Sequence, residues 1–136
     1  LLDSTKKKID YLREFCQTNG YNIECVAARA EDYAKKNRET YDLVVSRAVS
    51  ELNILLELCM PLVKVGGVFV AMKGADGINE LNISKSAIEK LGGSLELTDN
   101  QFLPSGDNRI NFKFKKIKAT NHKYPRTFGE MKKKPL

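Results

Sequence analysis

The sequence predicts an α/β fold in which most strands of the sheet run parallel and an antiparallel strand lies near the C-terminal end. Leu43–Val45 and Val68–Met72 are runs without a polar residue, which is typical of parallel strands covered on both faces. Apolar residues recur at helical spacing between these runs. Two later stretches alternate apolar and polar residues, as the two strands of a hairpin do. Repeated strand–helix units that end in such a pair indicate this fold class.

The same patterns give the order of the elements. Ser4 is a candidate N-cap for a first helix, and Gly20 stands where a C-terminal cap belongs. We then expect a strand at 21–26, a short helix at 31–36, a strand at 41–46, a helix from residue 52 to Pro61, a strand at 68–72, a helix at 79–91 and strands at 94–98 and 110–114. Gly92 and Gly93 end the last of these helices.

Charge divides the chain near its C-terminal end. Residues 113–136 hold nine of the 23 Lys and Arg residues and one of the 17 acids, a net charge of +8, whereas the other 112 residues carry −2. We therefore expect a single domain at 1–118 and a basic tail at 119–136. Such a tail indicates a polyanionic partner, most simply nucleic acid, unless it is only a solvated segment that aids solubility.

Composition excludes several kinds of site. His122, the only histidine, lies in the basic tail, so this chain provides neither a histidine-based triad nor a multi-histidine metal site. The glycine pairs lack the P-loop and dinucleotide-binding patterns. Cys16, Cys25 and Cys59 have apolar neighbours, and we expect them to pack in the core. No apolar run approaches a membrane span in length, so we expect no membrane partner. We also expect a cytoplasmic protein that is a monomer and binds no metal.

Arg47 is the residue whose position is most informative about chemistry. It follows the apolar run Leu43–Val45 after a single serine, and ligands of open α/β sheets bind at the carboxyl ends of the strands. Its guanidinium offers five donors, which suit a carboxylate, a phosphate or a base edge. The alternative is that Arg47 only pairs with Asp42 or Glu51.

Six segments, taken in order, resemble a known family. They are Leu2–Ser4 with Lys7–Ile9 and Leu12, Arg29–Asp32, Tyr41-Asp42 with Ser46–Val49, Val65–Gly67 with Lys73-Gly74, Leu103–Gly106, and Tyr124–Arg126 with Gly129, Lys133, Pro135 and Leu136. Together they resemble the bacterial 16S ribosomal RNA guanine-N7 methyltransferases, the glucose-inhibited division protein B family, over the whole chain. The resemblance implies a Rossmann-like class I methyltransferase fold, the cofactor S-adenosylmethionine and a guanine of 16S rRNA as methyl acceptor.

The resemblance also assigns cofactor-binding residues. Ala30 and Glu31 match the positions beside the adenine of the cofactor, and Arg47 matches the family's cofactor-contacting arginine. Asp3 ends the strand where related folds place an acid over the ribose hydroxyls, a role that an acceptor-only carboxylate fits. The alternative for Glu31 and its neighbour Asp32 is that they merely enrich a helix N-terminus, where negative charge is favourable.

We expect no catalytic general base. N7 of guanine presents an unprotonated acceptor on the major-groove edge, so positioning and exclusion of water can supply much of the rate. The partner implied is 16S rRNA, the small ribosomal subunit or its precursor. The candidates for phosphate contacts are Lys73, Lys123, Arg126, Lys132, Lys133 and Lys134. Tyr124 and Phe128 either stack on bases or pack against the domain.

The chain begins at Leu1 without an initiator methionine, so we expect an upstream portion outside this sequence. The resemblance implies that this portion holds the first strand, which lies between the strands ending at Asp3 and Ser46, and the glycine-rich loop around the methionine part of the cofactor. We therefore expect a gap in the sheet and an inactive, weakly stable isolated chain. Two alternatives stay open: another α/β nucleotide-binding enzyme, and a non-catalytic RNA-binding or ribosome-associated domain.

Overall fold

The structure is a computed structural model that describes residues 1–47 and 50–136. Ala48 and Val49, which belong to the motif that follows Ser46 and Arg47, lie outside the described residues. The strands are β1 (Leu2–Asp3), β2 (Val26–Ala27), β3 (Tyr41–Arg47), β4 (Val63–Lys73), β5 (Gly93–Phe102) and β6 (Asn108–Lys116). The helices are α1 (Lys6–Thr18), α2 (Ala30–Lys36), α3 (Leu52–Cys59), the 3-10 helix η1 (Met60–Leu62), α4 (Gly77–Ile83), α5 (Lys85–Lys90) and α6 (Phe128–Lys133).

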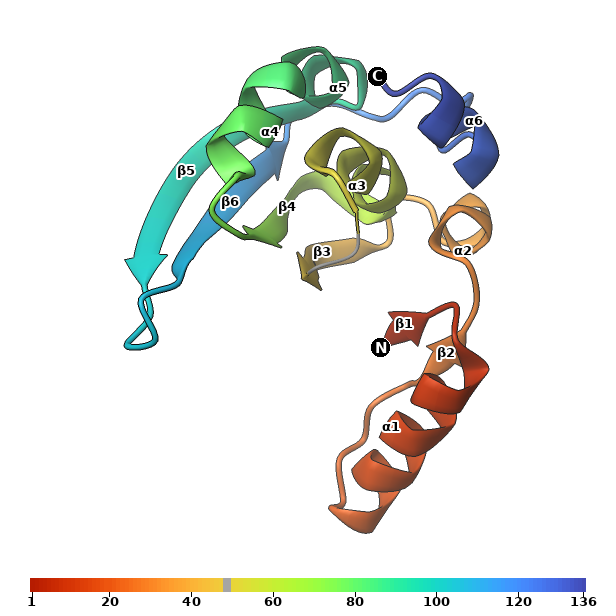
Figure 1. The fold of residues 1–136 in the computed structure, drawn as a ribbon. Coiled ribbons are helices and arrows are strands. Elements are labelled where there is room, and N and C mark those ends of the chain that lie inside the picture. Colours follow the sequence, from red (N-terminus) through yellow and green to blue (C-terminus); the bar gives the residue numbers. More distant parts are fainter. Residues whose placement is uncertain (48–49) are drawn as a thin grey trace.

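The described strands form two separate sheets. β1 pairs in parallel with β2, and the larger sheet has the order β3-β4-β6-β5. β3 and β4 are parallel, whereas β6 runs antiparallel to both β4 and β5. This arrangement confirms the predicted mixed sheet, in which parallel strands precede an antiparallel pair. β5 is the outer edge, and the β5–β6 hairpin reaches away from the rest of the molecule (Figure 1).

The main hydrophobic core lies between the larger sheet and the helices α3, α4 and α5, which cover one of its faces (Figure 1). Phe69 of β4 and Phe112 and Phe114 of β6 are fully buried there. All eight residues of α3 are buried, as expected for a helix enclosed by other elements. We call β3–β6 with α2–α6 and η1 the body.

Residues 1–27 form a second, smaller unit, which we call the N-terminal lobe. It contains β1, α1 and β2, and its own core consists of Ile9, Cys16 and Cys25, with Leu12 packed against them. Cys59 is buried in the body. All three cysteines are therefore buried and free, as predicted from their apolar neighbours.

At the ends of α1, the predicted C-terminal cap is confirmed and the predicted N-cap is wrong. Gly20 has a φ of +71°, and the N–H groups of Gly20 and Tyr21 donate to the carbonyls of Gln17 and Cys16, which is the predicted glycine cap. Ser4 is not the N-cap. That position is taken by Thr5, whose side chain makes no capping hydrogen bond.

Two other predicted elements differ from the structure. The strand expected at 21–26 is only β2, because its partner β1 is two residues long and pairs only Leu2 with Val26 and Asp3 with Ala27. The helix expected at 79–91 is split into α4 and α5 at Ser84. The Ser84 hydroxyl donates to the Glu80 carbonyl at 2.6 Å, a local bond that competes with continuing the helix.

The C-terminal segment, residues 117–136, is packed on the body. Arg38 donates to the carbonyls of Thr120 and Tyr124 at 2.7 and 2.6 Å, and Tyr124 and Met131 are part of the main core. The predicted boundary at residue 119 therefore describes a change in charge, not the start of an unpacked tail. Among the described residues, no helix has the length and apolar character needed to cross a membrane.

Candidate active site

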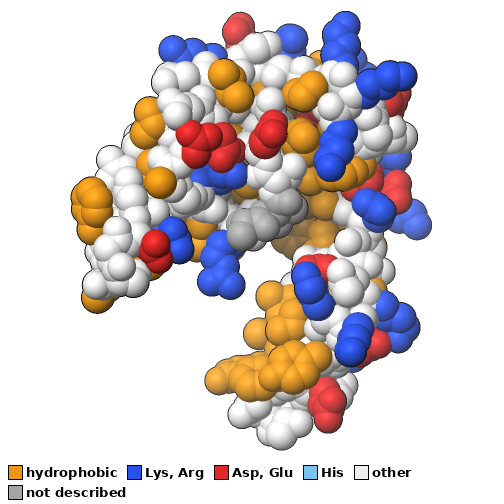
Figure 2. All heavy atoms as spheres, in the orientation of Figure 1, with side chains coloured by type: hydrophobic (Ala, Val, Ile, Leu, Met, Phe, Trp, Pro, Cys, Tyr) orange, Lys and Arg blue, Asp and Glu red, His pale blue; other side chains and the backbone are white. Residues whose placement is uncertain are grey.

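A cavity of about 830 Å³ separates the N-terminal lobe from the body. This volume falls within the range of small-molecule sites, roughly 300–1,000 Å³. Residues from β1, β2, the start of α2, β3 and α3 line it, and Phe128 of α6 contributes to its wall. Figure 2 shows the surface hollowed between the lobe and the body.

Two strand edges without a strand partner face this cavity. Among the described residues, β1 pairs only with β2, and β3 pairs only with β4. Leu43 and Val45 of β3 line the cavity and are 57% and 54% exposed, although their sequence is that of a buried strand. The predicted gap in the sheet, between the strands ending at Asp3 and Ser46, is thus present in the structure.

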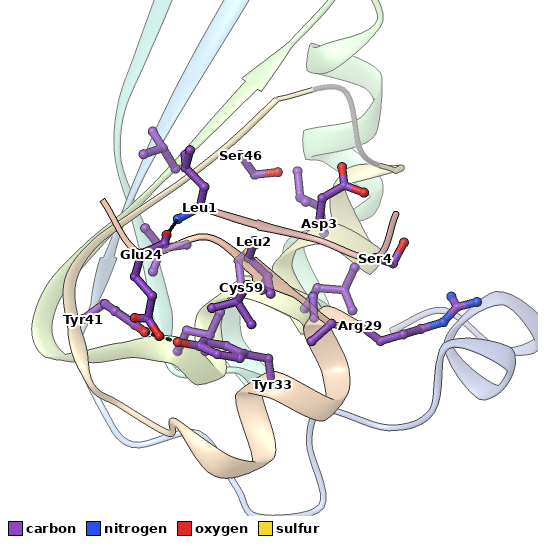
Figure 3. Close-up of a pocket in the computed structure, with 18 of the residues that line it drawn as sticks. Leu1, Leu2, Asp3, Ser4, Glu24, Arg29, Tyr33, Tyr41, Ser46 and Cys59 are labelled. Atoms are coloured by element: carbon purple, nitrogen blue, oxygen red, sulfur yellow. Dashed lines mark hydrogen bonds between the residues drawn. The ribbon is translucent and has the colours of Figure 1, made fainter. Parts of the chain in front are cut away.

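Asp3 lies in the lining of the cavity at the end of β1. Figure 3 shows it beside Ser4 and on the same side of the cavity as Ser46 of β3. The Thr5 N–H donates to Asp3 Oδ1 at 2.7 Å, and Lys8 lies 3.7 Å from Oδ2. The Thr5 backbone hydrogen bond is the largest influence and holds the pKa of Asp3 below its ordinary value. Asp3 therefore presents an ionised, acceptor-only carboxylate to the cavity.

Ala30 and Glu31 begin α2, directly after β2. Ala30 lines the cavity, whereas Glu31 is 7% exposed and is not part of the lining. No hydrogen bond or ion pair to the Glu31 carboxylate occurs among residues 1–47 and 50–136. The alternative that Glu31 serves only as an acid in the first turn of α2 is compatible with its position.

Arg47 is the last residue of β3, opposite Met72 of β4. Its neighbour Ser46 lines the cavity, but Arg47 itself is exposed and outside the lining. The alternative, that Arg47 pairs with Asp42 or Glu51, finds no such ion pair among residues 1–47 and 50–136, and Asp42 lies 3.3 Å from Lys64. In the described part of the chain Arg47 has no ion-pair partner.

The other end of the cavity holds residues that the sequence did not single out. Tyr33 of α2 and Tyr41 of β3 bond to each other through their hydroxyls, and both line the cavity together with Cys59. The hydrogen bond with Tyr41 is the main cause that raises the pKa of Tyr33 to about 12. Burial raises the pKa of Cys59 to about 12. Tyr33 and Cys59 therefore stay protonated at neutral pH. No sequence pattern distinguished these residues from ordinary core residues.

Two of the six predicted phosphate contacts are engaged in ion pairs within the fold. Lys73 lies 2.7 Å from Glu80, donates to the Ser50 carbonyl and has a side chain only 9% exposed. Arg126 makes a bidentate pair with the buried Glu57, at 2.9 and 2.7 Å. Their donors already have partners, which the predictions from charge did not take into account.

The other four predicted phosphate contacts are on the surface of the C-terminal segment. Lys123, Lys132, Lys133 and Lys134 are exposed. Lys123 lies 5.1 Å from the centroid of the Tyr124 ring. Figure 2 shows Lys and Arg side chains gathered over the side of the molecule where α2 and α6 lie. Within residues 1–47 and 50–136, no cluster of three or more His, Cys, Asp or Glu residues could hold a metal ion.

Solved structures share this fold. An rRNA methylase from Streptococcus thermophilus matches 86% of this chain and 72% of its own with a TM-score of 0.63 at 12% sequence identity. The M. jannaschii protein TYW2 in complex with AdoMet matches 85% of this chain and 57% of its own, also with a TM-score of 0.63, at 20% identity. The chain therefore has the Rossmann-like fold of class I S-adenosylmethionine-dependent methyltransferases.

The family is defined by sequence. The model of the family described as rRNA small subunit methyltransferase G matches residues 1–103. The ribosomal RNA small subunit methyltransferase G of Clostridium novyi is 47% identical over 140 residues, which cover all of this chain and 58% of that protein. The chain belongs to this family, and it spans somewhat more than half of the length of the curated relatives that it matches.

Proposed function

We propose that this chain is part of an enzyme that transfers the methyl group of S-adenosylmethionine to N7 of a guanine in 16S rRNA, in the cytoplasm and as a monomer. The observation that carries the proposal is the cavity at the ends of β1 and β3, which is lined by Asp3 and Ala30. Membership of the rRNA small subunit methyltransferase G family supports an rRNA substrate.

The residues at the cavity fit the chemistry of this cofactor. The ionised carboxylate of Asp3 can accept hydrogen bonds from a pair of ribose hydroxyls. Val26, Ala28 and Ala30 offer small apolar side chains in the lining, which suit the flat face of an adenine. We assign Asp3, Ala30, Glu31 and Arg47 to the cofactor, as the family resemblance implies; Glu31 and Arg47 are outside the lining of the cavity in this chain, and the guanidinium of Arg47 would meet an anionic or carbonyl group of the cofactor.

The cofactor, when bound, supplies an electrophilic methyl group on a sulfonium. N7 of guanine needs no deprotonation, so the protein has to orient the two partners and exclude water. Tyr33 and Cys59 in the lining are held protonated, and we assign the ionised carboxylate of Asp3 to the ribose hydroxyls. We propose that no side chain of this chain acts as a general base.

The gap between β1 and β3 supports a role for the rest of the full-length protein. We propose that one of its strands fills the part of the cavity between the free edges of β1 and β3, which would bury Leu43 and Val45, and leaves the part beside Asp3 and Ser46 to the cofactor. Each buried backbone group that gains a partner avoids a cost of about 1–3 kcal/mol. The cofactor site is then complete only in the full-length protein.

The first test is methyl transfer by the full-length protein to small-subunit RNA, with 7-methylguanosine detected by mass spectrometry of the nucleosides. Formation of this nucleoside supports the proposal. Methylation at another atom, or RNA binding without any affinity for S-adenosylmethionine, contradicts it.

The second test uses two carboxylates in the full-length protein. Asp3→Asn should weaken cofactor binding by about tenfold, since a hydrogen bond to a charged group contributes about 1.5–3 kcal/mol. Asp42→Asn is the matched control, because Asp42 pairs with Lys64 on the surface. If Asp42→Asn or Glu51→Gln abolished methyl transfer while both substrates still bound, the absence of a general base would be refuted.

A further inference from the structure

Phe128, the first residue of α6, has two cations against its ring at the wall of the cavity. The guanidinium carbon of Arg29 lies 5.9 Å and the Lys132 ammonium 5.4 Å from the ring centroid. Phe128 itself lines the cavity. We propose that Arg29 and Lys132 bind a backbone phosphate of the RNA substrate beside the methyl-transfer site, an inference that rests on the proposed function.

The ring and Lys132 are held in place by bonds at both ends of α6. Thr127 and Glu130 form a capping box at its start. Arg126, anchored on Glu57, also donates to the Lys134 carbonyl at 2.9 Å, just after the helix ends. Met131 is fully buried. The position of α6 on the body is therefore fixed before any ligand binds, which lowers the entropic cost of binding.

The side chain of Arg29 differs from those of four other arginines, which are bound to groups of the protein itself. Arg13 and Arg126 are each bound to a carboxylate, Arg38 to two backbone carbonyls, and Arg109 lies 3.5 Å from Asp107. In the described part of the chain, the side chains of Arg29 and Lys132 make no hydrogen bond and no ion pair. Both are exposed, so their charges are available to a ligand.

The contact with Phe128 positions the side chains of Arg29 and Lys132 without using their N–H donors. A cation against an aromatic face is stabilised by about 0.5–1 kcal/mol at an exposed site. The N–H groups of a guanidinium lie in its plane and remain free to form the paired hydrogen bonds that a phosphate accepts. A lysine beside it adds a compact positive charge.

The direction of Arg29 favours RNA over the cofactor. Its backbone flanks the cavity as the residue before α2, but Figure 3 shows its side chain extending away from Asp3 toward the C-terminal segment. The same side of the molecule carries the gathered Lys and Arg side chains of Figure 2. A strand of RNA that places a guanine at the cavity passes this surface, where phosphates are the groups that positive side chains recognise.

The test measures RNA binding by the full-length protein as a function of salt concentration. We compare wild type with Arg29→Gln, Lys132→Gln and the double variant, using small-subunit rRNA as the ligand. The matched control is Lys85→Gln with Lys90→Gln, which removes the same charge from exposed positions of α5 that do not line this cavity. Affinity for S-adenosylmethionine is measured on every variant.

We expect the double variant to bind the RNA about tenfold more weakly at moderate salt. The slope of log K against log salt should flatten by roughly 0.7 for each phosphate that the variant no longer neutralises. Arg29→Lys, which keeps the charge, should recover most of the slope, and unchanged cofactor affinity of the Gln variants shows that they are folded. Cofactor affinity and the α5 control should match wild type.

Three outcomes would overturn the inference. The first is an unchanged salt slope in the double variant, and the second is an equal change in the α5 control. The third is a loss of cofactor affinity, which would assign Arg29 to the cofactor instead. A failure of the proposed function is distinguishable, because wild type itself would then form no 7-methylguanosine in small-subunit RNA.

Discussion

The two walls of the cavity differ in what holds them together. On one side, the main core joins 18 buried residues of the described part of the chain, which include residues of α3, β4 and β6 as well as Tyr124 and Met131 of the C-terminal segment. On the other side, the N-terminal lobe has three buried residues of its own. Burial of apolar surface is the dominant source of stability, so the body can hold its shape by itself. The lobe depends much more on whatever pairs with its free strand edge.

The residues of the candidate site are also divided between the body and the N-terminal lobe. The body contributes Arg47, Phe128 and Lys132. The lobe contributes Asp3, which is held by a hydrogen bond from Thr5 and an ion pair with Lys8. A cofactor that contacts both sides requires a fixed distance between them. This is why we place a strand of the full-length protein in the gap, and the predictions below address the difference between the two sides.

The largest expected effect comes from the same substitution made on each side. Phe112→Ala in the body should lower the free energy of unfolding of the full-length protein by about 3–5 kcal/mol, because it leaves a cavity in a fully packed core. Phe15→Ala on α1 should cost roughly 1 kcal/mol or less, since Phe15 is 48% exposed and stacks only on Tyr21. Denaturant unfolding measures both. Equal losses would show that lobe and body are equally packed.

The second effect concerns the attachment of the C-terminal segment to the body. Glu57→Gln leaves Arg126 without its carboxylate, and breaking a buried pair from one side costs about 3–5 kcal/mol. We expect a smaller loss of about 2–4 kcal/mol, because the Arg126 side chain keeps 21% exposure. Hydrogen exchange of α6 should speed up in this variant while α1 stays unchanged. A loss of protection in α1 as large as that in α6 would contradict the division into lobe and body.

The third effect is a dependence of stability on pH. Burial raises the pKa of Glu39, but the Thr120 N–H and Lys116 outweigh this, so its pKa lies below the ordinary 4.5. A carboxyl with a depressed folded pKa stabilises the protein above that ordinary value, and the stabilisation is lost as pH falls through the folded value. Glu39→Gln should therefore cost about 1–2 kcal/mol at neutral pH and flatten the loss of stability below about pH 4.5.

The control for this prediction is Glu96→Gln, whose carboxyl pairs with Lys113 on the surface of the β5–β6 hairpin. It should leave neutral stability close to that of wild type, because exposed ion pairs contribute little. An acid-unfolding curve identical for wild type and Glu39→Gln would remove Glu39 from the contacts that join the C-terminal segment to the body.

The smallest effect tests the start of α6. Thr127→Ala removes the side chain that accepts from the Glu130 N–H, and loss of an N-cap costs about 1 kcal/mol. In RNA binding, the variant should lose less than Lys132→Gln does, because Phe128 remains in the wall of the cavity. Thr127→Ser should restore stability. A stability equal to wild type in Thr127→Ala would show that α6 does not need its cap.

The sheet could be predicted from local pattern because its strands are long and apolar. Val68–Met72 is a short, unbroken apolar run, β6 alternates apolar and polar residues, and both appear as strands where expected. The prediction of a strand at 21–26 was wrong because the length of a strand also depends on its pairing partner. The length of β2 is limited by the two residues of β1, a partner that the period cannot show.

The candidate site could be predicted in its location but not in its electrostatics. The resemblance assigned Asp3, Ala30, Glu31 and Arg47 to the cofactor, and of these Asp3 and Ala30 line the cavity, whereas Glu31 and Arg47 do not. Net charge, in contrast, could not separate Lys73 and Arg126, which form ion pairs with Glu80 and with the buried Glu57, from the exposed lysines of α6. Arg29 was missed as a phosphate contact because only the fold brings it to Phe128.

The measurement closest to the central claim is calorimetric titration of S-adenosylmethionine into this 136-residue chain and into the full-length protein. If the cavity between lobe and body becomes a cofactor site only when a further strand fills the gap, the full-length protein binds at micromolar strength and the chain shows no binding at the same concentrations. Micromolar binding by the chain alone would contradict the account.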